Sequence, residues 1–279
     1  MIIYSNGCSH TADAMEYRYD NVYIDIIAKE ILENYKLIKV QEGYYNDFKN
    51  FNFKDLYTDT NYLLKNAAHG KSNDLIFFES YNIIKDSIIN NVKLDFVIIQ
   101  FSGVNRRIHS NPDGSLLNVN PFDNSELGVK FEPFATEQSL QYILILQDLL
   151  KEHSIKYCFI PYMEFDSDTL DKSSNLKFID TKYLTTTLYK GHRNSFRKKG
   201  FVMDAPGHPN HLGYYKLAKM IMKKLGLSDK IKSIEDYFSK KTIKKDNEYL
   251  LPLLELIKEH GDVLKDGTND DMSDIKHLL

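Results

Sequence analysis

The chain has 279 residues, 42% hydrophobic and 27% charged, which is typical of a globular protein that can bury a sizeable core. Its 36 Lys and Arg residues nearly balance its 39 Asp and Glu residues, which argues against a nucleic-acid-binding protein with a large basic surface. Two cysteines cannot form a disulfide framework, and no apolar stretch approaches the roughly 20 residues that a membrane span needs.

Four apolar runs, each bounded by polar or glycine-containing turns, predict β-strands. They are Ile2–Ser5, Tyr62–Leu64, Phe96–Phe101 and Tyr157–Pro161. The third run is continuous rather than alternating, as expected of a parallel strand that is buried on both faces.

Helical spacing of apolar residues lies between and after these strands. The predicted helices cover residues 20–34, 73–91, 137–151 and 210–225, and Gly226 is a typical helix stop. The alternation of strand and helix predicts an α/β fold with a parallel sheet and right-handed crossovers.

Two regions interrupt this alternation. Residues 106–136 are rich in Pro, Gly, Asn, Asp and Ser, and we expect this insertion to form a lid or a wall beside the substrate. Residues 229–279 are acidic apart from one amphipathic stretch, Tyr249–His260. We therefore predict a domain over residues 1–228 and a helical C-terminal extension over 229–279. The extension is expected to associate with another copy of the chain or to pack as an accessory layer.

Small, glycine-containing segments follow the predicted strands or precede the last helix. They are residues 6–11, 66–73, 102–107 and 204–213. Ligands of open parallel sheets bind beyond the carboxyl ends of the strands, so these segments should meet at one crevice. Together they supply a serine, oxyanion donors and a histidine, the groups that acyl transfer to a hydroxyl nucleophile requires.

In order and separation, these segments resemble the conserved blocks of the SGNH (GDSL-like) hydrolases. Gly7-Cys8-Ser9-His10-Thr11 is similar to the Gly-Asp-Ser-x-Thr block, which implies that Ser9 is the nucleophile and that its N–H joins the oxyanion hole. Gly70 matches the glycine whose N–H is the second donor, and Gly103-Val104-Asn105 implies the Asn105 side chain as the third. His208-Pro209 resembles the block that carries the catalytic base, His208.

The resemblance covers roughly residues 1–226. It implies a three-layer α/β/α sandwich with a flavodoxin-like parallel sheet, a small-molecule or glycan ester as substrate, and no metal or organic cofactor. The wording of the first two blocks is most like that of proteins from bacteria and their phages. With no signal peptide or membrane span expected, the protein should be cytoplasmic in a bacterium or associated with a virion, with the extension as the surface for a virion partner.

The sequence departs from the family pattern at three positions. Cys8 and Arg106 replace two aspartates that take no part in proton transfer. Asp204 lies four residues before His208, where the family places its aspartate three before. Either the Pro206-Gly207 turn returns the carboxylate to the histidine or a backbone carbonyl orients it instead.

Simpler interpretations exist for several of these residues. Ser9 alone could be a helix N-cap, and Cys8 could be a nucleophile or a small core residue. Asn105 could shape a turn, and Arg106 could contact a carboxylate or phosphate on the substrate or simply be solvated. The histidines His10, His69, His208 and His211 lack the spacing of known zinc sites. Lys71 and Asn73 are expected to begin a helix rather than to act in catalysis.

The function that the residues favour is therefore a serine esterase or carbohydrate-ester deacylase. Ser9 would attack, His208 would act as base, and Asp204 would orient the base. Two alternatives stay open at this point: an O-acyltransferase, which differs only in the acceptor, and a catalytically silent binding or assembly module with the same fold.

Overall fold

The computed structural model describes residues 1–8, 11–12, 22–39, 51–57, 59–68, 71–103, 107–110, 116–119, 132–161, 178–184, 203–204, 208–209 and 211–232. For residues 107–110, 116–119, 132–135, 181, 203–204, 208–209, 211–213 and 216, the description is of the backbone.

A five-stranded parallel sheet forms the centre of the molecule. Its strands are β1 (Ile2–Gly7), β2 (Tyr35–Lys39), β3 (Asn61–Ala67), β4 (Phe96–Gln100) and β7 (Lys156–Ile160). Their spatial order is β2-β3-β1-β4-β7, and every neighbouring pair is parallel. Thus β1 is the central strand, with β3 on one side and β4 on the other.

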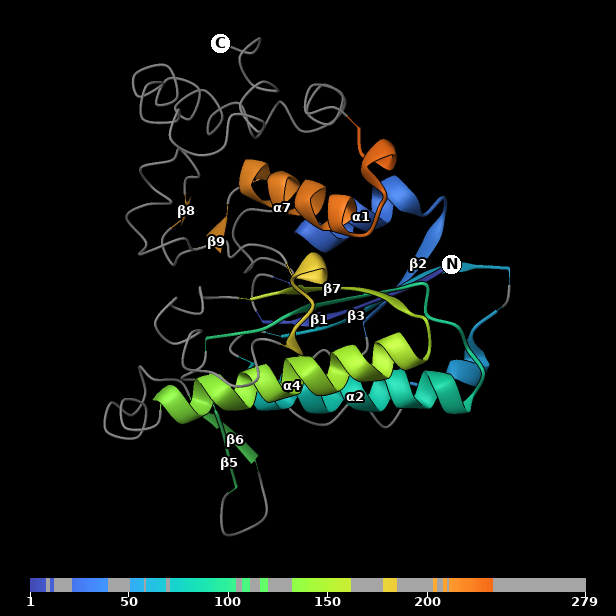
Figure 1. Ribbon diagram of the computed structural model, residues 1–279. Helices are drawn as coiled ribbons and strands as arrows, with labels where there is room; N and C mark the ends of the chain where they lie inside the picture. Colours follow the sequence, from blue (N-terminus) through green and yellow to red (C-terminus); the bar gives the residue numbers. More distant parts are fainter. Residues whose placement is uncertain are drawn as a thin grey trace, which may run out of the picture.

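Helices cover both faces of this sheet (Figure 1). α1 (Tyr23–Ile31) and α7 (His211–Lys224) pack together on one face, and α2 (Asn73–Ile89) and α4 (Glu132–Glu152) pack together on the other. The predicted three-layer α/β/α sandwich is confirmed.

The alternation of side chains along each strand supplies a hydrophobic core to both helical layers. Ile3 and Leu63 belong to the core under α1 and α7, whereas Tyr4 and Leu64 belong to the core under α2 and α4. Successive strand residues point to opposite faces, so a strand buried on both faces is largely apolar on both.

The structure adds a strand that the sequence did not predict. The predicted helix over 20–34 ends at Ile31, and Asn34 takes a left-handed backbone with φ of 48° before β2 begins at Tyr35. Asn tolerates this conformation better than most residues. β2 was missed because it lies at the sheet edge, where Leu37 is 44% exposed and the apolar signal is weak. Without β2, the order β3-β1-β4-β7 follows the first four positions of a flavodoxin-like sheet.

Part of the predicted insertion has regular structure. β5 (Arg107–Ser110) and β6 (Leu116–Val119) form an antiparallel hairpin, and β5 contacts α2. Residues 132–136 belong to α4, which begins five residues earlier than predicted. Pro133 stands in the first turn of this helix, where a missing backbone N–H costs nothing.

The first residues of the predicted extension pack on the α1–α7 layer. Ile231 contacts its core, as does Leu227 just before the extension, and the hydroxyl of Tyr215 donates a hydrogen bond of 2.6 Å to the carbonyl of Lys232. Residues 233–279 lie outside the described residues, so the helical extension and its role in association stay predictions. Within the described ranges, no helix combines the length and apolar character needed to cross a membrane.

Burial should make the thiol of Cys158 inert. This residue lies in β7, is fully buried, and has its pKa raised to about 12 by loss of solvation. The thiolate is the reactive form, so we expect no alkylation of Cys158 by iodoacetamide in the native protein and complete alkylation in guanidinium. Peptide mass spectrometry measures both. Labelling of Cys158 in the native protein at a rate close to that in guanidinium would contradict the tight packing of β7.

Candidate active site

The predicted site segments follow three adjacent strands of the sheet. Because β3, β1 and β4 are parallel neighbours, their carboxyl ends lie along one edge. The segments that follow them contain Gly70, Ser9 and Asn105, respectively. These three residues and Arg106 lie outside the described residues. The structure does describe the backbone of Asp204 and His208 and the ends of β1, β3 and β4.

A tight turn follows β1 at the position of the predicted nucleophile. The N–H groups of Thr11 and Ala12 both donate to the carbonyl of Cys8, at 2.9 and 3.0 Å. In the sequence, Ser9 follows Cys8 directly. A β-carbon at Gly7 would lie 2.3 Å from Thr11 Oγ1 and 2.9 Å from Gln100 Cβ, so the turn requires glycine there.

Buried hydrogen bonds hold this turn from the α1 side. Thr11 Oγ1 donates to Gln100 Oε1 at 2.7 Å and lies 2.6 Å from the hydroxyl of Tyr23. Since the threonine proton points to Gln100, Tyr23 is the donor in the second contact. Burial raises the pKa of Tyr23 well above its ordinary value, so its hydroxyl keeps the proton that this bond needs.

Cys8 is part of the same buried cluster. Its Sγ accepts a hydrogen bond of 3.4 Å from Gln100 Nε2, and the residue has no exposed surface. This environment is that of a small core residue, which is one of the two interpretations left open by the sequence.

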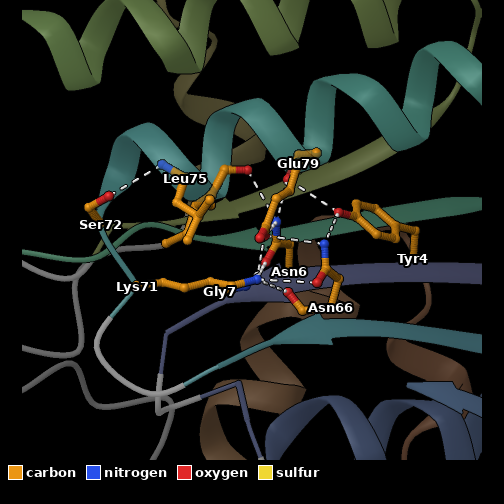
Figure 2. A network of polar contacts seen from close by, with 10 residues as sticks. Tyr4, Asn6, Gly7, Asn66, Lys71, Ser72, Leu75 and Glu79 are labelled. Atoms are coloured by element: carbon orange, nitrogen blue, oxygen red, sulfur yellow. Dashed lines mark hydrogen bonds and ion pairs between the residues drawn. The ribbon is translucent and has the colours of Figure 1, made fainter. Parts of the chain in front are cut away.

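The opposite face of the strand ends holds a buried ion pair, between Lys71 and Glu79 (Figure 2). Lys71 Nζ also contacts Asn6 Oδ1 at 3.1 Å, the carbonyl of Asn66 at 2.9 Å and Asn66 Oδ1 at 3.2 Å. Only 2% of Lys71 and 5% of Glu79 is exposed, so these protein groups replace the water that the charges lose.

The two asparagines complete this Lys71–Glu79 network. Asn6 Nδ2 donates to Glu79 Oε2 at 3.3 Å and Asn66 Nδ2 donates to the same oxygen at 3.2 Å. Burial lowers the pKa of the Lys71 ammonium and raises that of the Glu79 carboxyl, while the attraction between the two charges acts against both shifts. The network therefore keeps two ionisable groups buried between the sheet and α2.

A second asparagine contact fixes the turn after β4. Asn73, at the start of α2, accepts from the N–H of Ser102 at 2.6 Å and donates to the carbonyl of the same residue at 3.1 Å. It also donates to Ser139 Oγ in α4 at 2.9 Å. Asn73 does begin a helix, as predicted, and in addition it connects this helix to the turn that leads to Asn105.

The backbone brings the last two predicted site residues together. β8 (Met203–Asp204) and β9 (His208–Pro209) form a two-residue antiparallel ladder in which Asp204 is the partner of His208. Opposed residues in such a ladder have Cα atoms about 4.5–5.5 Å apart. β9 contacts α7, which attaches this short hairpin to the body of the domain.

Sequence reasoning missed the groups that support the turns. Asn6 and Asn66 follow the predicted strands Ile2–Ser5 and Tyr62–Leu64, and Gln100 lies within Phe96–Phe101; in the structure each of the three ends or nearly ends a strand. A polar residue at the end of an apolar run is the signal that could have drawn attention to them. Glu79 gives no such signal, because an acidic residue within a helix is ordinary. Among the residues whose side chains the structure describes, no group of three or more His, Cys, Asp and Glu residues could hold a metal ion.

No family model and no curated protein matches the sequence. Among solved structures, similar chains include an alpha/beta hydrolase enzyme from the metagenome of Lake Arreo, Spain (10% identity, TM-score 0.43) and an acetyl xylan esterase variant from Geobacillus stearothermophilus (12%, 0.41). A member of the lipolytic G-D-S-L family from Veillonella parvula is also similar (13%, 0.40). The alignments cover 80–81% of this chain and 94–96% of the others. At these values, the function has to be inferred from the chain's own residues.

The close approach of Gly7 and Thr11 can be tested by a double-mutant cycle. A methyl group at Gly7 collides with Thr11, so Gly7→Ala should lower the free energy of unfolding by about 1–3 kcal/mol, measured by urea titration. Thr11→Ala removes the threonine hydroxyl and part of the collision. The double variant should therefore be more stable than the sum of the two single changes predicts, whereas simple additivity would contradict the collision.

Proposed function

We propose that this chain is a serine hydrolase that cleaves small-molecule or carbohydrate esters through an acyl-enzyme. Ser9 is the nucleophile, His208 the general base and Asp204 the residue that orients the base. The N–H groups of Ser9 and Gly70 and the side-chain amide of Asn105 stabilise the oxyanion.

The observation that carries this proposal is the order β3-β1-β4 at the centre of the sheet. The motifs with Gly70, Ser9 and Asn105 are separated by more than 30 residues in the chain, yet they follow three neighbouring strands. Ser9 follows the middle one of these strands, and Gly70 and Asn105 follow the strands on either side of it. This order supports the proposal, because a tetrahedral intermediate needs donors that converge on one oxygen.

The reaction would proceed in two halves. Ser9 Oγ attacks the ester carbonyl carbon while His208 takes the hydroxyl proton, and the carbonyl electrons move to the oxyanion. When the intermediate collapses, the bond to the alcohol oxygen breaks and His208 gives its proton to that oxygen. Water then attacks the acyl-enzyme with His208 again as base, which releases the acid and restores Ser9.

The backbone pairing of Asp204 with His208 supports the orienting role of the aspartate. Although Asp204 and His208 are four residues apart in the sequence, they are opposite each other in the β8–β9 register. A carboxylate beside the imidazole selects its tautomer and stabilises the imidazolium that forms during attack.

Replacing the nucleophile tests the proposal. With p-nitrophenyl acetate as substrate, Ser9→Ala should lower kcat by at least about 10⁴-fold, because the substitution removes the proposed nucleophile. The thermal unfolding temperature should change little, since a serine in a turn contributes little to the core. Retention of more than about a tenth of the activity would exclude Ser9 as the nucleophile.

Cys8→Ala is the matched control for this experiment. It alters the neighbouring residue in the same turn, but its thiol is buried and accepts one weak hydrogen bond. Activity within a few-fold of the wild type is expected. Loss of activity in Cys8→Ala, with Ser9→Ala still active, would instead identify a cysteine nucleophile.

The role of Asp204 is tested by its amide analogue. Asp204→Asn keeps the size of the side chain and removes its charge, so kcat should fall by about 10³–10⁴-fold, as when the aspartate of a catalytic triad is lost. Asp229→Asn, an exposed aspartate beyond α7 with a side chain that is 74% exposed, is the control and should be fully active. A fall of less than tenfold in Asp204→Asn, with His208→Ala inactive, would leave a Ser–His pair oriented by a backbone carbonyl.

A further inference from the structure

Lys71 closes the loop that contains one of the proposed oxyanion donors. Its Nζ contacts the carbonyl and the Oδ1 of Asn66, at 2.9 and 3.2 Å. The side chain of Lys71 therefore binds the residue five positions before it in the chain. Gly70 lies inside this loop, directly before Lys71. The ammonium therefore restricts how the backbone can run between the end of β3 and the start of α2.

The same ammonium also contacts the strand that carries the nucleophile turn. Asn6 Oδ1 accepts both from Lys71 Nζ, at 3.1 Å, and from the N–H of Gly7, at 2.8 Å. Gly7 is two residues before Ser9. A single oxygen thus connects the lysine to the backbone at the exit of β1, as Figure 2 shows.

We propose, on the basis of the function inferred above, that Lys71 is a positioning residue for ester hydrolysis. It connects the end of β3 and the end of β1 to α2, and the segments with Gly70 and Ser9 follow these two strand ends in the sequence. Fixed strand ends would allow both N–H groups to bind one oxyanion. Lys71 does not touch the substrate. It acts through Asn6 and Asn66, and Glu79 on α2 balances its charge.

A role as catalytic base does not fit this geometry. The three ammonium protons face four acceptors, on Asn6, Asn66 and Glu79, and 2% of the residue is exposed. A base needs an unshared electron pair that is directed at the nucleophile.

Stability alone is also a weak reason for this pair. A buried ion pair often contributes no more to stability than apolar residues of the same volume, because both charges lose their hydration. In this chain the pair connects three elements at the predicted oxyanion hole. Displacement of a reacting group by about 1 Å can cost roughly 100-fold in rate, so a fixed separation of the two loops has a direct effect on kcat.

The chain contains a matched control on the other face of the sheet. Lys65, in β3, forms an ion pair of 3.1 Å with Asp25 of α1, and the two residues are 3% and 8% exposed. This pair has the same chemistry and burial as the Lys71–Glu79 pair. Its lysine lies on the α1 side of β3 and does not close the loop that contains Gly70.

The experiment compares two double variants, Lys71→Met/Glu79→Gln and Lys65→Met/Asp25→Asn. Each removes both charges of a pair, so that no unpaired buried charge remains. Kinetics with p-nitrophenyl acetate give kcat and KM, inactivation by a fluorophosphonate gives the reactivity of the serine, and thermal unfolding gives stability.

The Lys71 variant should lose at least about 30-fold in kcat and in the fluorophosphonate rate, with KM changed less than about threefold, because the oxyanion forms only after binding. The Lys65 variant should keep kcat within about threefold of the wild type, even if its unfolding temperature falls as far as that of the Lys71 variant. Equal losses of kcat in the two variants, or none in the Lys71 variant, would overturn the proposal.

Two further measurements make each outcome decisive. If the Lys71 double variant does not fold, Lys71→Gln/Glu79→Gln, which also leaves no unpaired buried charge and keeps a hydrogen-bond donor at residue 71, gives the same comparison. Failure of both to fold, while the Lys65 variant folds, would make Lys71 a core residue and overturn the proposal. Ser9→Ala in the same assay separates the two inferences. If Ser9→Ala stays active, the proposed function fails. If Ser9→Ala is inactive and the Lys71 variant is fully active, only the proposed role of Lys71 fails.

Discussion

The carboxyl edge of the sheet depends on one buried charge, the ammonium of Lys71. A cation that leaves water must find acceptors within the protein, and here Glu79, Asn6 and Asn66 supply them. These acceptors belong to α2, β1 and β3, so the solvation of a single group couples the ends of two strands to the beginning of a helix. The segments that would form an oxyanion hole follow β1 and β3, directly after these contacts.

The other face of the same strand end is held by steric fit. Gly7 lies against Thr11 so closely that a β-carbon would collide, and Thr11 is itself held between Gln100 and Tyr23. The exit of β1 is therefore fixed by hydrogen bonds to charged and amide groups on the α2 side and by close packing on the α1 side. A strand end that is held from both sides gives the segment after it a fixed starting point, which pre-organised catalysis would require.

Long apolar runs and helical spacing predicted four of the five sheet strands and the four main helices. The prediction failed where the local signal was weak. β2 is an edge strand in which three of the five residues are exposed, and the first turn of α4 contains a proline. For the candidate site, the motifs indicated Ser9 and His208, but Lys71 was interpreted only as a residue at a helix start. Its importance depends on Glu79, an ordinary acidic residue of α2, and on Asn6, which is distant in the sequence.

The sequence by itself determined the fold class and the identity of the groups that could carry out acyl transfer, because apolar periodicity and short glycine-containing motifs are local properties of the chain. The tertiary structure alone decided the order of the strands, which makes β3, β1 and β4 neighbours. It also decided the register that opposes Asp204 and His208 across a short hairpin, which a spacing of four residues left open. Strand order and register depend on how distant segments fill a common core and satisfy buried polar groups, and no local pattern records these constraints.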